Sequence, residues 1–418
     1  MAASTGLGGG VVHALILSNA LDTNGQNARY VSAARKHGEH ERIMKALAIG
    51  NYDPAGVAER FRLASEKLGG LELRAAHRTT AYFDFPVDLV WTKINEPEIR
   101  RIAAEADVIH LNNSPLAMRK LRLKKPALLH HHGTLFRSNP DAMLVTARVG
   151  KMAQAVSTVD LMKPAPDVLH WLPTAYDIGA LRKQGDAARR KRKQDGRVRI
   201  VHAPTSREGK HTELFLEATR QLIAEGLPID VVIVENKTNA ECLAIKATAD
   251  IVYDQLKWGY GCNSVEAWGM GIPVISGADE WTIGQMEKMW SRTPFYQATE
   301  ATLKQKIKDL ALSADLRAEW GDIGSNHVTT HHDELPALER LVELYRVAIR
   351  TFQRPRIAMK GNVRPVTFRN TKGKSIIVDG EYVRFSNQLL TTEDPMVIER
   401  LLYYVRERPL LGIEVETV

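Results

Sequence analysis

Residues 250–277 read DIVYDQLKWGYGCNSVEAWGMGIPVISG, and the rest of the chain can be placed from this stretch. Ile251–Tyr253 is a short apolar run typical of a buried strand. Gly259 and Gly261 follow it, and glycine permits backbone conformations that bulkier residues hinder. We therefore expect a strand that leads into a glycine loop.

A short helix and a second strand complete this unit. Asn263 or Ser264 is placed to cap the helix, and Gly271 is placed to end it. Residues 273–276 then form the next strand. In such a βαβ unit, the loop N–H groups and the helix N-terminus favour a bound anion. The alternative is a plain turn that binds nothing.

The same stretch resembles the donor-binding signature of GT-B glycosyltransferases, in particular the large retaining family that uses nucleotide sugars. The positions in register are Gly259, Tyr260, Gly261, Glu266, Ala267, Gly271, Pro273, Val274 and Ile275. The resemblance implies that Glu266 holds the ribose hydroxyls of the donor. It also places in the donor site the loop residues Cys262, Asn263 and Ser264.

Trp258 departs from this signature, because it stands where the family has a first glutamate that contacts the donor sugar. An indole cannot accept hydrogen bonds from sugar hydroxyls, but it offers a face for stacking. We expect altered sugar selectivity, with Asp254 and Gln255 as candidate substitutes for the missing glutamate. A degenerate site that binds without turnover is the alternative.

A second anion-binding element follows the strand Val198–His202. Arg207 and Lys210 lie three residues apart before a helix that starts near Thr212, where two cations can face a diphosphate. They resemble the family's phosphate-binding Arg and Lys, although His211 replaces the glycine that ordinarily follows. The resemblance implies that both cations neutralise the departing diphosphate without a metal ion. A charged loop without a ligand is the alternative.

The N-terminal part shows the start of another Rossmann-like domain. Residues 11–17 form a strand-like run, residues 18–26 form a polar loop that contains Asn24 and Gly25, and residues 27–37 form a helix. The resemblance implies that this loop faces the cleft between two domains. An Asn-Gly pair alone fits a plain turn equally well.

Histidines follow two later strands. His110 lies in one, and the strand at residues 126–129 runs into three histidines at residues 130–132. The resemblance implies that His132 contacts the donor sugar and that His110 and His131 line the cleft. Successive side chains of an extended chain point to opposite faces, so three adjacent histidines do not converge on one metal ion. The alternative is one buried histidine beside two that face solvent.

Composition narrows the class of protein. The 418 residues are 44% hydrophobic and 25% charged, which is typical of a soluble chain with two or three domains. No run of about 18 apolar residues occurs, so no membrane span is expected, and residues 1–10 lack the pattern of a signal peptide. Two cysteines, Cys242 and Cys262, argue against a disulfide framework and fit a reducing cytoplasm.

The charge of the chain gives only a weak indication of its ligand or partner. The net charge of +8 fits an anionic ligand, an acidic partner or a nucleic acid. The basic run at residues 189–193 fits a solvated linker or a helix face. No aromatic residues interleave it, which argues against a nucleic-acid-binding arm.

The end of the chain is not explained by the GT-B resemblance. The expected elements are strands at residues 364–368, 375–378 and 382–385, a hairpin turn at Asp379-Gly380 and a helix from Asp394 to about residue 406. This pattern is loosely similar to small terminal modules of tailed-phage proteins. It suggests a phage-encoded enzyme of the host cytoplasm whose end docks on a protein or self-associates. A plain extension is the alternative.

These features predict an α/β protein of the GT-B type, with two Rossmann-like domains facing a cleft and a small C-terminal α+β appendage. The expected boundaries are 11–178 for the acceptor-side domain, 197–335 for the nucleotide-sugar domain, 336–352 for a helix that crosses back, and 353–418 for the appendage. The resemblance implies a retaining transferase that moves a sugar from a UDP- or GDP-sugar to a glycan or protein acceptor. The alternatives are a nucleotide-sugar epimerase of the same fold and a non-catalytic sugar- or nucleotide-binding protein.

Overall fold

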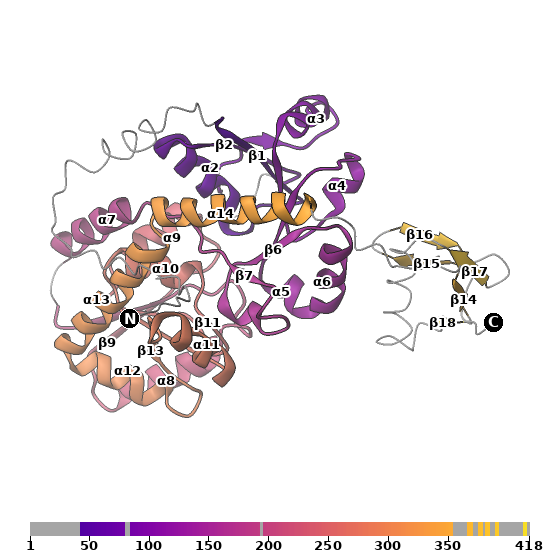
Figure 1. The fold of residues 1–418 in the computed structure, drawn as a ribbon. Coiled ribbons are helices and arrows are strands. Elements are labelled where there is room, and N and C mark those ends of the chain that lie inside the picture. The colour runs from indigo at the N-terminus through magenta and orange to yellow at the C-terminus, as the bar shows by residue number, and fades with distance from the viewer. Residues whose placement is uncertain are drawn as a thin grey trace, which may run out of the picture. The chain divides into compact units, whose positions relative to one another are not determined.

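The structure is a computed structural model that describes residues 42–79, 84–192 and 195–353, and five short strands between residues 366 and 415. Two largely parallel sheets with their connecting helices make up most of the described chain (Figure 1). The strand predicted at residues 11–17 and the loop with Asn24 and Gly25 lie outside the described residues, so both stay predictions.

The first sheet has the order β3-β2-β1-β4-β5-β6-β7, and all its strands are parallel. Its strands are β1 (Met44–Gly50), β2 (Leu71–His77), β3 (Leu89–Val90), β4 (Val108–Asn112), β5 (Ala127–His131), β6 (Ala153–Val156) and β7 (His170–Trp171). Its helices are η1 (Pro54–Gly56), α2 (Val57–Leu68), α3 (Glu96–Glu105), α4 (Leu116–Lys120), α5 (Gly133–Ser138), α6 (Pro140–Val149) and η2 (Val159–Met162). The strand order reverses between β1 and β4, and ligands bind at such a switch point in open α/β sheets.

The second sheet has the order β11-β12-β10-β8-β9, with β13 also paired to β12. Its strands are β8 (Val198–His202), β9 (Ile229–Ile233), β10 (Ile251–Tyr253), β11 (Trp258–Gly259), β12 (Val274–Ala278) and β13 (Tyr296–Gln297). Its helices are α7 (Ile178–Lys191), α8 (Thr212–Ala224), α9 (Asn239–Lys246), α10 (Cys262–Gly269), α11 (Glu280–Trp290), α12 (Leu303–Leu312) and α13 (Ala314–His331). Here the switch point lies between β8 and β10, both of which have their predicted bounds.

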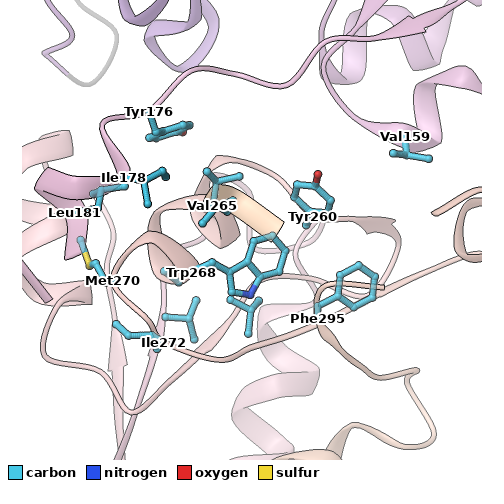
Figure 2. Packing of buried hydrophobic residues seen from close by; sticks show 14 of the residues in the cluster. Val159, Tyr176, Ile178, Leu181, Tyr260, Val265, Trp268, Met270, Ile272 and Phe295 are labelled. Atoms are coloured by element: carbon cyan, nitrogen blue, oxygen red, sulfur yellow. The ribbon is translucent and has the colours of Figure 1, made fainter. Parts of the chain in front are cut away.

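Trp268 of α10 is a centre of the second domain's packing. It is buried with Tyr260, and the two ring centroids lie 5.0 Å apart (Figure 2). A Cβ atom on Gly324 of α13 would come within 2.0 Å of the indole, so only glycine permits this approach of α13 to Trp268. Helix α13 continues through Gly321 and Gly324 to His331.

The long helix α14 (Glu334–Gln353) packs on the first domain. Leu341 and Tyr345 are buried in one cluster with Phe61 of α2 and Leu128 of β5. Helix α14 follows α13, the last helix of the second domain, directly in the chain.

The described C-terminal strands are β14 (Val366–Asn370), β15 (Ser375–Val378), β16 (Glu381–Arg384), β17 (Leu389–Thr392) and β18 (Ile413–Val415). β15 and β16 pair in antiparallel fashion with Val378 opposite Glu381, as the predicted hairpin requires. The helix predicted from Asp394 lies outside the described residues. Within the described ranges, no helix is both long enough and apolar enough to cross a membrane.

Candidate functional site

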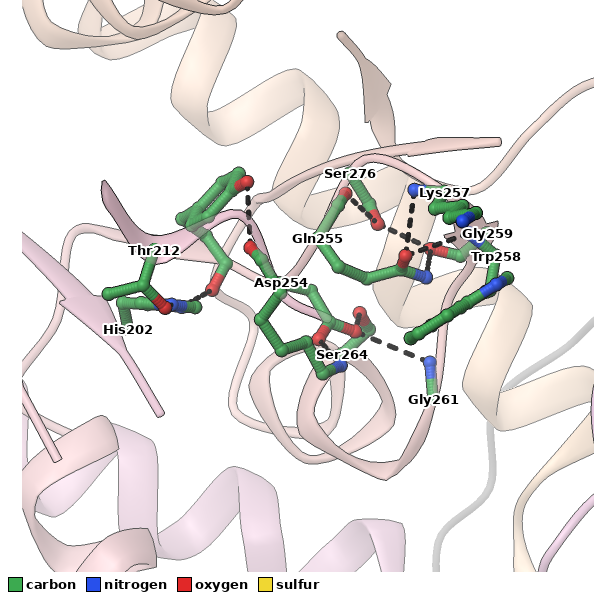
Figure 3. A network of polar contacts seen from close by, with 12 residues as sticks. His202, Thr212, Asp254, Gln255, Lys257, Trp258, Gly259, Gly261, Ser264 and Ser276 are labelled. Carbon is green, nitrogen blue, oxygen red and sulfur yellow. Dashed lines mark hydrogen bonds and ion pairs between the residues drawn. The ribbon is translucent and has the colours of Figure 1, made fainter. Parts of the chain in front are cut away.

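Lys210 and Asp254 meet at the switch point of the second sheet. Lys210 comes from the loop between β8 and α8, Asp254 follows β10, and Nζ lies 2.5 Å from Oδ1. The Ser264 hydroxyl donates to Oδ2 at 2.6 Å and the Gly261 N–H donates to it at 3.3 Å (Figure 3). Burial raises the pKa of Asp254, but Lys210 and these donors outweigh it and hold the pKa below its usual value. The ionised carboxylate therefore joins the loop between β8 and α8 to the start of α10.

Gln255 shapes the glycine loop from inside. Its Oε1 accepts from the N–H groups of Lys257 and Trp258 at 2.8 and 2.7 Å, and its Nε2 donates to the Gly259 carbonyl at 2.9 Å (Figure 3). Asp254 and Gln255 are both buried with these internal partners. They support the loop, and neither presents a free oxygen in place of the family's first glutamate.

The start of α10 differs from the expected capping. The N-cap is Gly261 in an extended conformation, and glycine has no side chain to cap the helix. The Ser264 hydroxyl is bound to Asp254 instead. Asn263 has its side-chain oxygen and nitrogen buried without a hydrogen-bond partner among the described residues. Buried amide groups ordinarily have partners, so this side chain is an exception. The assignment of Asn263 to the donor site stays a prediction.

Arg207 lies on the same loop as Lys210 and is more exposed. Its guanidinium donates to Glu213 at 2.8 Å and to Glu235 at 2.9 Å, and these two carboxylates raise its pKa. A diphosphate at this loop would compete with both carboxylates for Arg207.

His211 adopts a left-handed conformation with φ of 53° at the N-cap of α8. This region favours glycine, which explains why the family signature has glycine at this position. The histidine Nδ1 is also buried without a partner among the described residues. The departure at His211 therefore carries a local energetic cost.

Glu266 sits in a buried, charged cluster within α10. Its Oε2 lies 2.5 Å from Nζ of Lys246, while Oε1 lies 3.5 Å from Nη2 of Arg60 and 3.4 Å from Nδ2 of Asn239. Burial lowers the pKa of Lys246, but Glu266 and other neighbours outweigh it and raise the pKa overall. Lys246 therefore keeps its charge in this buried contact with Glu266.

Sequence reasoning missed these partners of Glu266. Lys246 ends α9, where a lysine is ordinarily a solvated C-terminal residue. Arg60 lies 206 positions away in α2. No local pattern indicates either contact, although the surplus of cations near a predicted anion site is a weak signal.

Trp258 lies against the loop between β8 and α8. A Cβ atom on Gly209 would come 3.2 Å from Cη2 of the indole, and the Arg137 guanidinium of α5 lies 4.5 Å from the ring centroid. Arg137 is held by Asp160 at 2.6 Å. The indole thus contacts both the loop between β8 and α8 and the Arg137 guanidinium of the first domain.

His110 and the three histidines at residues 130–132 are all buried, so the alternative in which two of those three face solvent is wrong. Alternation does send successive side chains to opposite faces, but both faces of a parallel sheet are covered. His132 Nε2 lies 3.2 Å from Asn112 Oδ1, and His110 Nε2 lies 3.1 Å from His130 Nδ1. Burial lowers the pKa of His132 and His110 to about 3, so both rings are neutral at pH 7. Among the described residues, no group of three acidic, histidine or cysteine side chains is arranged to hold a metal ion.

A small pocket of about 10 Å³ lies at the switch point of the first sheet. Its lining includes Gly50, Asn51, Arg78, Trp91, Ser114 and Lys120. Arg78 stacks on Trp91 at 4.8 Å, and both cations are exposed. A larger cavity of about 480 Å³ lies around Trp171, His331 and Arg340, and none of the predicted site residues lines it.

The basic run at residues 189–193 begins in the last turn of α7, and two of its arginines have structural partners. Arg189 donates to the Met270 carbonyl at 2.6 Å, and Arg192 donates to Asp250 at 2.6 Å. These contacts tie the run to the second domain.

The fold matches solved glycosyltransferase structures. Anabaena HepE in complex with UDP-glucose aligns with a TM-score of 0.51 at 14% identity, over 73% of this chain and 100% of that chain. A glycosyltransferase from Rickettsia africae aligns with a TM-score of 0.50 at 12% identity, over 74% of this chain and 99% of that chain. No protein-family model matches the sequence, and no curated protein matches it. At these identities the likeness shows the fold alone, and it confirms the predicted GT-B fold with two Rossmann-like domains.

Proposed function

We propose that the protein is a glycosyltransferase that moves a sugar from a nucleoside-diphosphate sugar to an acceptor hydroxyl. The observation that carries this proposal is the buried Glu266, in contact with Lys246, beside the loop of Gly259 and Gly261, in the register that the resemblance assigns to ribose binding. HepE, which shares the fold, was solved with UDP-glucose. UDP-sugars are therefore the first donors to test, and GDP-sugars the second.

In this proposal the diphosphate lies at the switch point of the second sheet. The bond between the anomeric carbon and the diphosphate oxygen breaks, and the leaving group gains negative charge. Lys210 and Arg207 stabilise that charge, since cations aimed at a developing charge act more strongly on the transition state than on the ground state. Retention of the anomeric configuration and independence of metal ions are parts of the proposal that rest on the resemblance.

His132 is assigned to the donor sugar. A neutral ring that donates from Nε2 to Asn112 Oδ1 leaves Nδ1 as an acceptor for a sugar hydroxyl. Asn112 Nδ2 in turn lies 3.2 Å from His77 Nε2, which orients the amide. His110 and His131 hold the surrounding strands through Tyr345 and Gln154, respectively, so their part in the cleft is a supporting one.

The acceptor is assigned to the first domain, where the pocket with Arg78 and Lys120 lies at the sheet's switch point. The acceptor class, glycan or protein, is left to experiment. Residues 353–418 are proposed to contribute to acceptor docking or self-association, in a phage-encoded enzyme of the host cytoplasm. Truncation after Gln353 should then preserve donor binding. It should reduce sugar transfer to the acceptor, or reduce self-association as measured by the molecular mass of the protein in solution.

A binding screen tests the donor assignment. Thermal shift and calorimetry with UDP, GDP and their sugars should show one preferred nucleotide for the wild type, and a ligand at 100 times its Kd stabilises by about 2.7 kcal/mol. Glu266→Gln should weaken binding by roughly 1.5–3 kcal/mol, as for lost hydrogen bonds to a charged group. Glu287→Gln, at an exposed position of α11, is the matched control. Unchanged affinity in Glu266→Gln would remove Glu266 from the ribose.

One alternative keeps the fold and changes the reaction. An epimerase would convert the nucleotide sugar to its epimer whether or not an acceptor is present. Chromatography of the sugar nucleotide after incubation without an acceptor separates that outcome from glycosyl transfer. A protein that binds the nucleotide sugar and leaves it unchanged with every acceptor would be a non-catalytic binder.

A further inference from the structure

Arg60 reaches from the first domain to the carboxylate that the proposed function assigns to the donor ribose. It lies in α2, and its Nη2 is 3.5 Å from Oε1 of Glu266 in α10. The other oxygen of Glu266, Oε2, is 2.5 Å from Nζ of Lys246 in α9. Two cations from different domains therefore hold the two oxygens of one carboxylate.

Aromatic rings hold Arg60 in this position. Its guanidinium carbon lies 4.0 Å from the centroid of Tyr176 and 5.4 Å from that of Phe85. Phe85 lies against Gly56, the N-cap of α2, where a Cβ atom would come within 2.5 Å of the ring. The Arg60 Nε also donates to the Ala55 carbonyl at 3.4 Å. This packing restricts the alternative positions of the guanidinium.

Two cations contact the one carboxylate of Glu266. Lys246 and Glu266 are 1% and 5% exposed, and Arg60 adds a second positive charge beside Glu266. Asp53 also attracts Arg60 and Asp254 also attracts Lys246, but the ion-pair contact of Asp254 is with Lys210. A buried charge without a partner is costly, whereas an anionic ligand beside the cluster would offset the surplus. The arrangement therefore suits a carboxylate that is held in one orientation next to a diphosphate.

We propose that Arg60 is a positioning residue for donor recognition, an inference that rests on the proposed function. Arg60 and Lys246 orient the Glu266 carboxylate so that it accepts hydrogen bonds from the 2′- and 3′-hydroxyls of the ribose. Ribose recognition in the second domain then depends on a side chain of the first domain. An arginine suits this role because its planar, always charged guanidinium can stack on Tyr176 and donate to a carboxylate together.

The test compares a ribonucleotide with its 2′,3′-dideoxy form. The probe is UDP or GDP, whichever the wild type binds more tightly, and affinities are measured by calorimetry. The wild type should prefer the ribose form by about tenfold or more, which is about 1.4 kcal/mol. In Arg60→Met this preference should shrink to less than about threefold, and Arg60→Lys should be intermediate. Arg62→Met, on the same helix and paired with Glu59 and Glu66, should keep the wild-type preference.

The preference for the ribose form separates a positioning role of Arg60 from a purely structural one. A general loss of packing would weaken the binding of both nucleotides alike. Equal weakening of both forms in Arg60→Met, or an unchanged preference, would overturn the inference. If Arg60→Met does not fold, Arg60→Lys carries the test, and a wild-type preference there overturns it. A wild type that binds neither nucleotide contradicts the proposed function itself, so the two failures are distinguishable.

Discussion

The Lys210 ammonium lies 2.5 Å from the fully buried carboxylate of Asp254, and this pair joins the two loops that meet at the second switch point. The pair gives Lys210 two roles. It holds the buried carboxylate in the free protein, and the proposed function also places it beside the diphosphate of the donor.

Lys210→Met should therefore affect both turnover and stability. We expect kcat to fall about 10²–10³-fold with a smaller change in KM, as for removal of a group that stabilises developing charge. Breaking a buried pair from one side costs roughly 3–5 kcal/mol, so Lys210→Arg is needed as a charge-preserving variant that keeps the fold. Lys237→Met, which removes an exposed pair with Glu241, is the control. A change confined to KM would contradict the role in the leaving step.

His211→Gly should stabilise the protein by about 1 kcal/mol, because it removes a non-glycine residue from the left-handed region. The change also removes a ring nitrogen that is buried without a described partner. Urea unfolding of the two proteins measures the difference, and donor affinity should not decrease. A destabilised His211→Gly variant would show that the imidazole makes a contact worth more than the backbone cost.

The buried histidines predict loss of stability on mild acidification. Burial lowers the pKa to about 4 for His77, His131 and His202, and to about 3 for His110, His132 and His332. The unfolded chain takes up these protons near pH 6.5, while the folded protein does not. Each histidine therefore contributes stability that is complete above about pH 6.5 and declines as the pH falls toward its folded pKa.

The free energy of unfolding should change steeply with pH. Each of these histidines costs about 1.4 kcal/mol per pH unit once the unfolded chain is protonated. The free energy of unfolding, measured by urea denaturation, should therefore fall steeply between about pH 6.5 and pH 5, before most carboxylates titrate. A free energy that stays constant over this interval would show that the rings are accessible to protons in the folded state.

Trp258→Ala should change sugar selectivity more than nucleotide affinity. The indole lies against Gly209 of the phosphate loop and under Arg137, so its removal opens space beside the diphosphate position. We expect the ratio of kcat/KM for two nucleotide sugars to change by about tenfold, with the Kd of the free nucleotide changed by less than about threefold. Loss of free-nucleotide binding would place Trp258 in the nucleotide site instead.

Short-range features of the fold could be predicted because their causes are local. The apolar runs of β8 and β10 gave the correct bounds, and the Asp379-Gly380 pair indicated the hairpin of β15 and β16. The length of helix α13 has no local cause of this kind, because glycine ordinarily weakens a helix interior and α13 contains Gly321 and Gly324. Gly324 is needed there by the close approach of Trp268, a contact between segments far apart in the sequence.

In the candidate site, too, features with local causes could be predicted and contacts between distant segments could not. The order of Gly259, Gly261 and Glu266 along the chain indicated where a donor would bind. The partners that set the charge of Glu266 could not be inferred, because Lys246 and Arg60 reach it only after both domains are formed. Asp254 was a candidate from its place in the sequence, but its buried position and its pairing with Lys210 are properties of the assembled sheet.

Turnover of a nucleotide sugar tests the central claim most directly. The wild type, with EDTA present, should slowly release nucleoside diphosphate and free sugar from its preferred donor, with water acting as the acceptor. Glu266→Gln should lose this reaction at donor concentrations near the wild-type KM, while Glu287→Gln should retain it. Release that requires added manganese would contradict the metal-independent mechanism. A wild type that binds the nucleotide sugar but leaves the bond to the diphosphate intact, with or without added acceptors, would contradict the assignment as a glycosyltransferase.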